Sequence, residues 1–131
     1  MIVSVDSSVI LAELLAERRQ PPSELWKEPL SSSRLLEYEV WNRLNALAAG
    51  DSHGAAAEDL IRRPDLVELS PVVLERALRP FPTQLRTLDA LHLAAALYLH
   101  GYRSDLHVAT YDKRMSDCAA AVGPPLFPLP P

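Results

Sequence analysis

The sequence alternates short apolar segments with longer helical ones, and this alternation constrains the fold more than any other feature. Strand-like segments are expected at residues 2–5, 30–33, 66–70 and 107–110. Helices are expected at residues 9–19, 34–49, 54–63, 87–100 and 114–121, with another beginning at Pro71. Parallel strands need helical crossovers between them. The pattern therefore predicts one α/β domain over residues 1–131, a three-layer α/β/α arrangement with a central parallel sheet.

Prolines and glycines mark the expected ends of these elements. Pro21 and Pro22 should close the first helix, and Ser70 followed by Pro71 predicts a helix N-terminus. Glycine caps are expected to end three helices, at Gly50, Gly101 and Gly123. The last apolar segment, LFPL at 126–129, contains a proline and is therefore expected only as an edge strand.

The composition excludes several classes of protein. The single cysteine, Cys118, excludes an internal disulfide framework and a multi-cysteine zinc site, and it is compatible with a reducing cytosol. No apolar run reaches the roughly 18–20 residues that span a bilayer, and the N-terminus carries no export signal, so a cytoplasmic protein is expected. The net charge of −4 argues against a broad electrostatic grip on nucleic acid, but it allows nucleic acid to be held at a small site.

Two aspartates follow expected strands. Asp6 follows the first strand in MIVSVDSSVI, and Asp112 follows the fourth in HVATYD. Ligands of open parallel sheets bind beyond the carboxyl ends of the strands. Either aspartate alone is typical of a turn or a helix cap. Their equivalent places indicate a shared site, although 106 residues separate them in sequence.

The strongest predicted helix, TLDALHLAAALYLHG, supplies a third acid. Asp89 lies in its first turn, where the helix dipole favours an anion, so an ordinary helix charge and a site residue both remain open. His92 follows one turn later and is interpreted as a packed, hydrogen-bonded side chain. The apolar stripe of this helix is expected at Leu88, Leu91, Ala95 and Leu99.

A glutamate comes from the earlier helix, SRLLEYEVWNRL. Both Glu37 and Glu39 flank its apolar stripe, and helical spacing alone does not choose between them. The stripe itself is expected at Leu36, Val40, Leu44 and Leu47.

Four segments in this order resemble the PIN-domain family, and within it the VapC-type toxins of prokaryotic toxin–antitoxin pairs. The segments are VDSSVIL, SSRLLEYEV, LRTLDALHLAAAL and VATYDKRMSDCAAAVG, and they cover nearly the whole chain. The glutamate is assigned through the phasing SRLLxxE, which leaves Glu37 as the reserve candidate. The acidic residues of the family then match Asp6, Glu39, Asp89 and Asp112, and Thr110 matches a family position as well.

The resemblance implies a ribonuclease that depends on Mg²⁺ or Mn²⁺ and forms no covalent enzyme intermediate. The chemistry agrees, because two carboxylates about 4 Å apart repel by roughly 4 kcal/mol at an effective dielectric constant near 20. A bound cation would relieve this repulsion. An oxygen-only ligand set without cysteine fits Mg²⁺ or Mn²⁺ rather than zinc. Such a metal lowers the pKa of bound water and stabilises charge on a phosphodiester oxygen.

The resemblance also suggests a role for each acid. Asp6 and Asp112 are expected to bind the metal directly, and Asp89 to hold a metal or its water shell. Glu39 is expected to orient or deprotonate the attacking water. These roles make the four acids the predicted catalytic residues.

Four further residues are candidates around the acids. Ser7 and Thr110 are expected to hydrogen-bond the carboxylates or water. Arg86 and Arg114 lie near the acids in sequence and are candidates for phosphate contacts, although a solvated or ion-paired arginine is the commoner case.

Partners also follow from the resemblance, which implies an RNA substrate, a cognate antitoxin and a homodimer. The expected first helix is apolar over much of its circumference, at Val9, Ile10, Leu11, Leu14 and Leu15. This surface fits either deep burial within the monomer or a groove for an antitoxin segment. Tyr38 and Trp41 on the second helix are candidates for an aromatic anchor.

Two other functions remain open. A phosphoaspartate phosphatase could use Asp6 as its nucleophile, but Ser8 replaces the second acid that haloacid-dehalogenase-like enzymes carry there. An interaction module could keep the fold without activity, although all four acids are retained. The chain has no glycine-rich phosphate loop, since its only glycines are Gly50, Gly54, Gly101 and Gly123.

Overall fold

A four-stranded parallel sheet forms the centre of the protein in the computed structural model, which describes residues 1–131. Its strands are β1 (Ile2–Val5), β2 (Leu30–Ser33), β3 (Asp65–Val67) and β4 (Leu106–Ala109). Their order in the sheet is β3-β2-β1-β4, so β1 is paired on both sides. The predicted central parallel sheet is confirmed.

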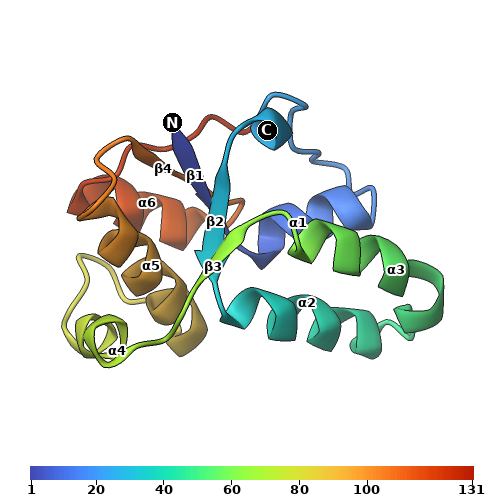
Figure 1. Cartoon of the computed structure of the whole chain (residues 1–131), viewed down its shortest axis with the longest axis horizontal. Helices are drawn as coiled ribbons and strands as arrows, with labels where there is room; N and C mark the ends of the chain where they lie inside the picture. Colours follow the sequence, from blue (N-terminus) through green and yellow to red (C-terminus); the bar gives the residue numbers. More distant parts are fainter.

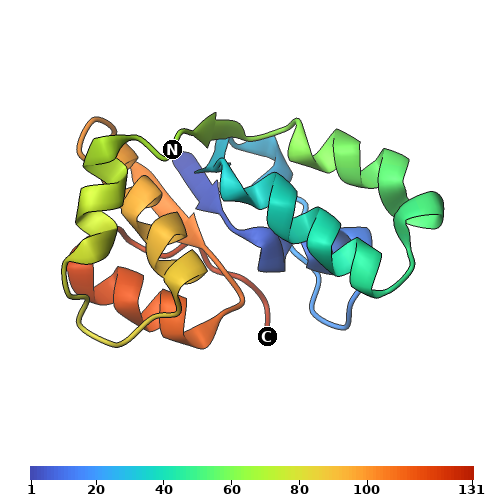
Figure 2. The ribbon, with the colours of Figure 1, turned by 90° about the horizontal axis from the view of Figure 1, so that it is seen from below.

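Helices cover both faces of this sheet. They are α1 (Ser7–Leu14), α2 (Leu35–Ala46), α3 (Gly50–Ile61), α4 (Pro71–Leu78), α5 (Thr87–His100) and α6 (Lys113–Val122), with a short 3₁₀ helix, η1 (Leu25–Lys27). Figure 1 shows α1, α2 and α3 on one side of the sheet and α4, α5 and α6 on the other. Figure 2 shows the same separation after a quarter turn. The three-layer α/β/α fold is therefore confirmed.

The central strand supplies side chains to both cores, because successive residues of a strand point to opposite faces. Val3 and Val5 belong to the larger cluster, which Leu36 of α2 and other residues complete on the α1–α3 side. Ile2 belongs to a second cluster with Leu93 of α5 on the opposite side. Full burial of one such side chain contributes about 1.5–3 kcal/mol. Both faces of the sheet must therefore be covered.

The second strand is polar and nevertheless buried. Ser31, Ser32 and Ser33 are each no more than 2% exposed. A buried hydroxyl is tolerated when it finds a hydrogen-bond partner. Ser32 Oγ donates to the carbonyl of Val5 at 2.7 Å, and Ser33 Oγ bonds a histidine of α5. The weakly marked strand predicted at residues 30–33 is confirmed with these bounds.

Two helices end earlier than predicted. α1 occupies Ser7–Leu14 instead of 9–19, and α2 ends at Ala46 instead of near Ala49. In each case an alanine shortly afterwards takes a left-handed backbone conformation, Ala16 with φ 50° and Ala48 with φ 51°. Such residues commonly end helices, although glycine takes this role more often. The cap predicted at Gly50 is wrong, since Gly50 is the first residue of α3.

Several other boundaries differ by a few residues. β3 occupies Asp65–Val67 instead of 66–70, and β4 is shifted by one residue, so Thr110 lies just beyond it. The edge strand predicted at 126–129 is reduced to an isolated bridge between Leu126 and Val108. The starts and ends predicted at Ser70, Gly101 and Gly123 are confirmed, and α5 has the predicted bounds.

The apolar stripe predicted for α5 is correct at the buried Ala95, whereas Leu91 and Leu99 are only partly buried. Leu88 is 45% exposed, whereas the buried face of the helix carries His92 and several small or branched residues, Ala90, Leu93, Ala94, Ala95 and Ala96. The stripe of α2 is correct at Leu36, Val40 and Leu44, while Leu47 lies beyond the helix and is exposed. None of the helices has the length and apolar character needed to cross a membrane.

Candidate active site

The carboxylate of Asp6 lies at the carboxyl end of the central strand, at the point where β1 turns into α1. It is 7% exposed. Its Oδ1 accepts hydrogen bonds from the backbone N–H of Ser8 at 3.1 Å and from Ser8 Oγ at 2.5 Å. Asp6 is therefore the N-cap of α1, and the cap interpretation is confirmed. The cap does not account for the second oxygen.

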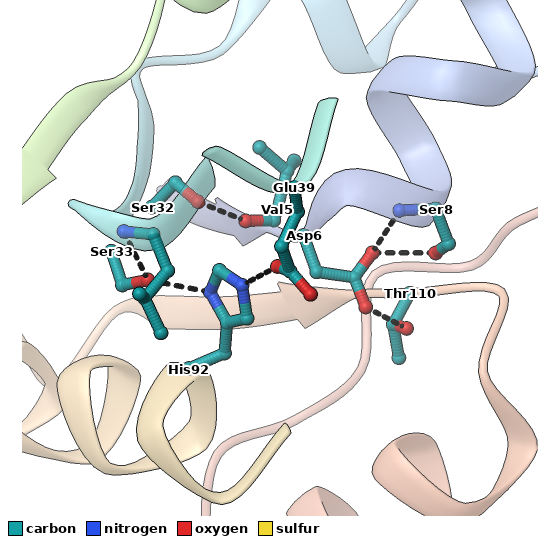
Figure 3. A network of polar contacts seen from close by, with 9 residues as sticks. Val5, Asp6, Ser8, Ser32, Ser33, Glu39, His92 and Thr110 are labelled. Atoms are coloured by element: carbon teal, nitrogen blue, oxygen red, sulfur yellow. Dashed lines mark hydrogen bonds and ion pairs between the residues drawn. The ribbon is translucent and has the colours of Figure 1, made fainter. Parts of the chain in front are cut away.

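That second oxygen, Oδ2, accepts a hydrogen bond from Thr110 Oγ1 at 2.5 Å. Thr110 lies close because Val5 and Ala109 are paired at the ends of β1 and β4. The same threonine oxygen accepts the backbone N–H of Asp112 at 3.0 Å, and Ser8 Oγ accepts that of Tyr111 at 3.0 Å. Two hydroxyls thus connect both oxygens of Asp6 to the turn after β4, as Figure 3 shows for Ser8 and Thr110.

The hydrogen bond expected from Ser7 is made by its neighbour Ser8. Ser7 is the first residue of α1, and no hydrogen bond of its side chain is present in the structure. An N-cap carboxylate characteristically accepts from residues two or three positions further on, which here selects Ser8. The predicted contact between Thr110 and an acid of the site is confirmed.

Asp112 is held in a similar way at the neighbouring strand. It is the N-cap of α6, and its Oδ1 accepts the backbone N–H of Met115 at 2.9 Å. Asp6 and Asp112 thus occupy equivalent positions after adjacent parallel strands. The shared sheet edge inferred from the sequence is correct.

Glu39 approaches from α2 and is bound by His92 of α5. The Oε1 atom of Glu39 is in contact with His92 Nε2, and His92 Nδ1 lies 2.6 Å from Ser33 Oγ at the end of β2. His92 is 5% exposed, so its interpretation as a packed, hydrogen-bonded residue is correct. In Figure 3 the carboxylate of Glu39 lies between His92 and Asp6. Glu37 has no contact with this network.

Asp89 completes the group from the first turn of α5. Burial raises the pKa of its carboxyl above the usual range, and the charges of Asp112, Asp6 and Glu39 raise that pKa further. A like charge nearby disfavours the ionised form of an acid, so these contributions show that the three carboxylates lie close to Asp89. Three of the predicted acids therefore act electrostatically on the fourth, Asp89, although the four come from separate segments of the chain.

The pKa of Asp6 is also raised, and here burial is the main cause. The hydrogen bonds from Ser8 and Thr110 favour the charged form and oppose this shift. The site therefore keeps a carboxylate where its ionisation is costly. Such perturbed acids are concentrated at functional sites, although structural networks also produce them.

The donor atoms suit a hard divalent cation, because the four acids offer carboxylate oxygens alone. Their present arrangement is not a finished metal site, since no three His, Cys, Asp or Glu side chains are placed to hold one ion. Both oxygens of Asp6 are engaged by hydroxyl groups, and one oxygen of Glu39 by His92. The chemistry of the residues fits the metal, although the acids are not gathered around a single point.

Two hollows with basic residues are present on the surface. Arg86 and Arg114 line one of about 590 Å³ together with Thr83, Gln84 and Leu85, and neither arginine forms an ion pair. The other, of about 670 Å³, is lined by Ser8 and Tyr111 of the acidic site and by Arg18 and Arg19.

The second hollow carries arginines that are not among the residues predicted from the sequence. The guanidinium of Arg19 stacks over the ring of Tyr111, with its central carbon 4.7 Å from the ring centre. The paired arginines Arg18 and Arg19 were the available signal. The sequence pattern predicts them at the end of the first helix, whereas they follow α1.

The residues predicted to contact a partner differ in how far they are exposed. In α1, Val9 and Ile10 are fully buried, while Leu11, Leu14 and Leu15 are only partly covered. On α2, Tyr38 is 64% exposed. Trp41 packs within the molecule instead, against Gly54 of α3, and its Nε1 donates to Glu58 at 2.7 Å. Trp41 is therefore partly buried, which leaves Tyr38 as the more accessible of the two aromatic side chains.

The fold and the acids at the sheet edge define the class of protein. The family model for the PIN domain matches residues 3–121, and the chain belongs to this family. The chain is 35% identical over 128 residues to Ribonuclease VapC46 of Mycobacterium tuberculosis (strain ATCC 25618 / H37Rv), covering 92% of each protein. Its fold is similar to the crystal structure of PAE2754 from Pyrobaculum aerophilum, with a TM-score of 0.59 and 21% identity over 89% of this chain and 78% of that one.

Proposed function

We propose that this protein is a metal-dependent endoribonuclease and the toxin of a toxin–antitoxin pair. The observation that carries the proposal is the convergence of Asp6, Glu39 and Asp112 on Asp89, whose pKa their charges raise. Membership of the PIN-domain family and similarity to Ribonuclease VapC46 support the same activity. The proposal treats residues 1–131 as one functional domain.

The metal of this proposal is Mg²⁺ or Mn²⁺, held by Asp6, Asp89 and Asp112. When bound, such an ion acidifies a coordinated water and neutralises charge that develops on the phosphodiester. Ser8 and Thr110 orient the Asp6 carboxylate from both sides. The repulsion among the acids makes the site ready for a cation, because a cation removes the cost of their charges.

Glu39 would orient the attacking water and accept its proton. One of its carboxylate oxygens bonds His92, and the other has no protein partner. Its side chain is 20% exposed, so water can reach it. A positioned general base contributes about 10²–10⁴-fold to a rate. Glu37 has no contact with His92 and is not assigned this role.

RNA would be held locally by arginines instead of by the overall charge, which is −4. Arg86 and Arg114 line one hollow from two different segments, and both guanidinium groups are free of ion pairs. Arginine is well suited to a phosphate, because its planar fork donates two hydrogen bonds at once. We assign this pair to backbone phosphates of the substrate.

The partners in this proposal are a cognate antitoxin and a second copy of the chain, in the cytoplasm. The partly covered residues Leu11, Leu14 and Leu15 support an antitoxin contact on α1, because they leave apolar surface at the end of the helix. A bound antitoxin segment would bury this surface.

A phosphoaspartate mechanism is less well supported. A nucleophilic aspartate needs an accessible oxygen, whereas Asp6 is 7% exposed and both of its oxygens accept hydrogen bonds from hydroxyl groups. Beryllofluoride treatment tests this alternative, since a modified Asp6 would support it.

The decisive experiment uses the purified protein free of its partner and a mixture of cellular RNAs. We expect cleavage with Mn²⁺ or Mg²⁺, no cleavage in EDTA and recovery when metal is restored. An Asp6→Asn variant prepared in parallel controls for a contaminating nuclease, and sequencing the new RNA ends identifies the target. Activity that persists in chelator would refute the metal mechanism, and a folded protein inactive on every RNA would favour the interaction module.

A further inference from the structure

We infer that His92 is a positioning residue, which holds the carboxylate of Glu39 through a directed chain of hydrogen bonds that begins at the end of β2. The inference rests on the proposed function, because it assigns Glu39 to the attacking water. The chain runs from the backbone N–H of Leu35 to Ser33 Oγ at 3.2 Å and from Ser33 Oγ to His92 Nδ1 at 2.6 Å. It ends at the contact between His92 Nε2 and Glu39 Oε1.

The direction of this chain follows from the number of protons. An ionised carboxylate only accepts, so His92 Nε2 must carry a proton and donate it to Glu39. Ser33 Oγ already accepts from Leu35 N–H and has one hydroxyl proton to give, and His92 Nδ1 is the group within reach. A neutral imidazole with its proton on Nε2 therefore pairs every donor in this series of hydrogen bonds with an acceptor. The other neutral tautomer would set two acceptors, Nε2 and Oε1, against each other.

The network is built from distant parts of the chain. Ser33 lies 59 positions from His92, and Glu39 lies 53 positions from it. Both Ser33 and His92 are buried, at 2% and 5% exposure, so bulk water does not compete with their bond. A packed histidine that served the core alone would need no link to a glutamate that is 20% exposed. The arrangement is therefore suited to setting the direction of the Glu39 carboxylate.

The consequence for the reaction is geometric. Holding a glutamate side chain in one rotamer costs conformational entropy. The bond from His92 offsets that cost before substrate arrives and leaves the second oxygen of Glu39 free. Figure 3 shows the Glu39 carboxylate between His92 and Asp6. His92 itself is too deeply buried to meet RNA, so it acts through Glu39.

Two variants of His92 separate positioning from packing. In His92→Gln the side-chain amide takes the place of Nε2 and can still donate to Glu39. In His92→Asn the shorter amide takes the place of Nδ1 and reaches only Ser33. We expect His92→Gln to keep kcat within a few-fold of wild type, and His92→Asn to lower kcat at least about tenfold with little change in KM. Equal losses, or a larger loss in His92→Gln, would overturn the inference.

A double variant tests the link to β2. Ser33→Ala should lower kcat in the wild-type background and leave it unchanged in the His92→Gln background, where the Nδ1 contact is already lost. Ser52→Ala is the matched control, because Ser52 Oγ lies 2.7 Å from His53 Nδ1 on the exposed surface. It should leave kcat unchanged. Additive effects of Ser33→Ala and His92→Gln would contradict a chain through His92.

A measurement without RNA keeps the inference separate from the proposed function. ¹⁵N–¹H spectra of the metal-free protein report which ring nitrogen of His92 carries the proton. We expect a proton on Nε2 and none on Nδ1, and we expect this preference to weaken in Ser33→Ala. A proton on Nδ1 would overturn the proposed direction of the hydrogen bonds even in an active ribonuclease. The expected tautomer in a protein inactive on RNA would contradict the proposed function alone.

Discussion

Replacing Asp6 with asparagine should stabilise the metal-free protein and abolish its response to magnesium. The variant removes one negative charge from a buried position near three other acids. It keeps the helix cap, because asparagine and aspartate cap equally well. Its Oδ1 can still accept from the backbone N–H of Ser8, which bonds Asp6 at 3.1 Å.

The magnitude follows from two opposing contributions. Two carboxylates about 4 Å apart repel by roughly 4 kcal/mol at an effective dielectric constant near 20, and a larger separation and the partial exposure of Asp89 reduce this repulsion. Against the relief stands the changed bond to Thr110, because the asparagine NH₂ group can only donate and Thr110 Oγ1 must then accept; a charge-assisted hydrogen bond also exceeds a neutral one by about 1 kcal/mol. The variant also avoids the cost of burying a charged carboxylate. We therefore expect the free energy of unfolding to rise by about 1 kcal/mol.

Magnesium should produce a larger effect in the wild type. At a hundredfold excess over Kd, a ligand that binds only the folded state adds about 2.7 kcal/mol. An unfolding entropy of about 2.1 cal/mol/K per residue, over 131 residues, converts this into roughly 10 °C of melting temperature. The same conversion gives the metal-free variant an advantage of about 4 °C. The variant should gain much less than the wild type from magnesium.

The pH dependence of stability independently tests whether the ionised Asp6 destabilises the metal-free protein. Burial raises the pKa of Asp6 above its ordinary value of 3.8, so over the interval between the two pKa values the folded protein keeps a proton that the unfolded chain releases. The free energy of unfolding then falls as the pH rises through this interval. The metal-free wild type should recover its deficit relative to Asp6→Asn as the pH is lowered towards 4.

Thermal melts of both proteins in EDTA and across a magnesium series decide the matter. Asp65→Asn is a matched control, because Asp65 is exposed on β3 and belongs to no ion pair. It should melt like the wild type and respond equally to magnesium. If Asp6→Asn melts lower than the wild type in EDTA and gains as much from magnesium, Asp6 is a helix cap and the site does not bind metal through it.

Three further outcomes are expected. Glu39→Gln should lower kcat by about 10²–10⁴-fold while Glu37→Gln stays near wild type, and equal activity of the two in an RNA cleavage assay would remove Glu39 from the mechanism. Arg86→Ala should raise KM and reduce by about 0.7 the slope of log K for RNA binding against log salt concentration. Arg103→Ala, which loses an ion-paired arginine, should change neither quantity. An unchanged slope in Arg86→Ala would contradict the phosphate contact. Leu14→Glu should weaken antitoxin binding, and unchanged affinity in a variant with native circular dichroism would show that α1 is not the contact.

The fold class could be predicted because its signals are local. Helix α5 carries its own start and stop, and Ser70 accepts the backbone N–H of Val73 as an N-cap should. Asp6 and Asp112 could be paired from the sequence because parallel strands place their carboxyl ends at one edge of the sheet. Local propensity did not fix the ends of α1 and α2, where Ala16 and Ala48 adopt the left-handed conformation without a glycine.

The connections within the site were decided by the tertiary structure alone. Thr110 meets Asp6 across 104 positions of sequence, and His92 joins Ser33 to Glu39 across 59 and 53. The apolar periodicity of α5 cannot predict that His92 belongs to this network, because its hydrogen-bond partners lie on β2 and α2. A hydrogen bond needs its two atoms within about 3 Å of each other. Only the folding of distant segments onto one sheet edge supplies that proximity, so the sequence could indicate the acids but not the network that orients them.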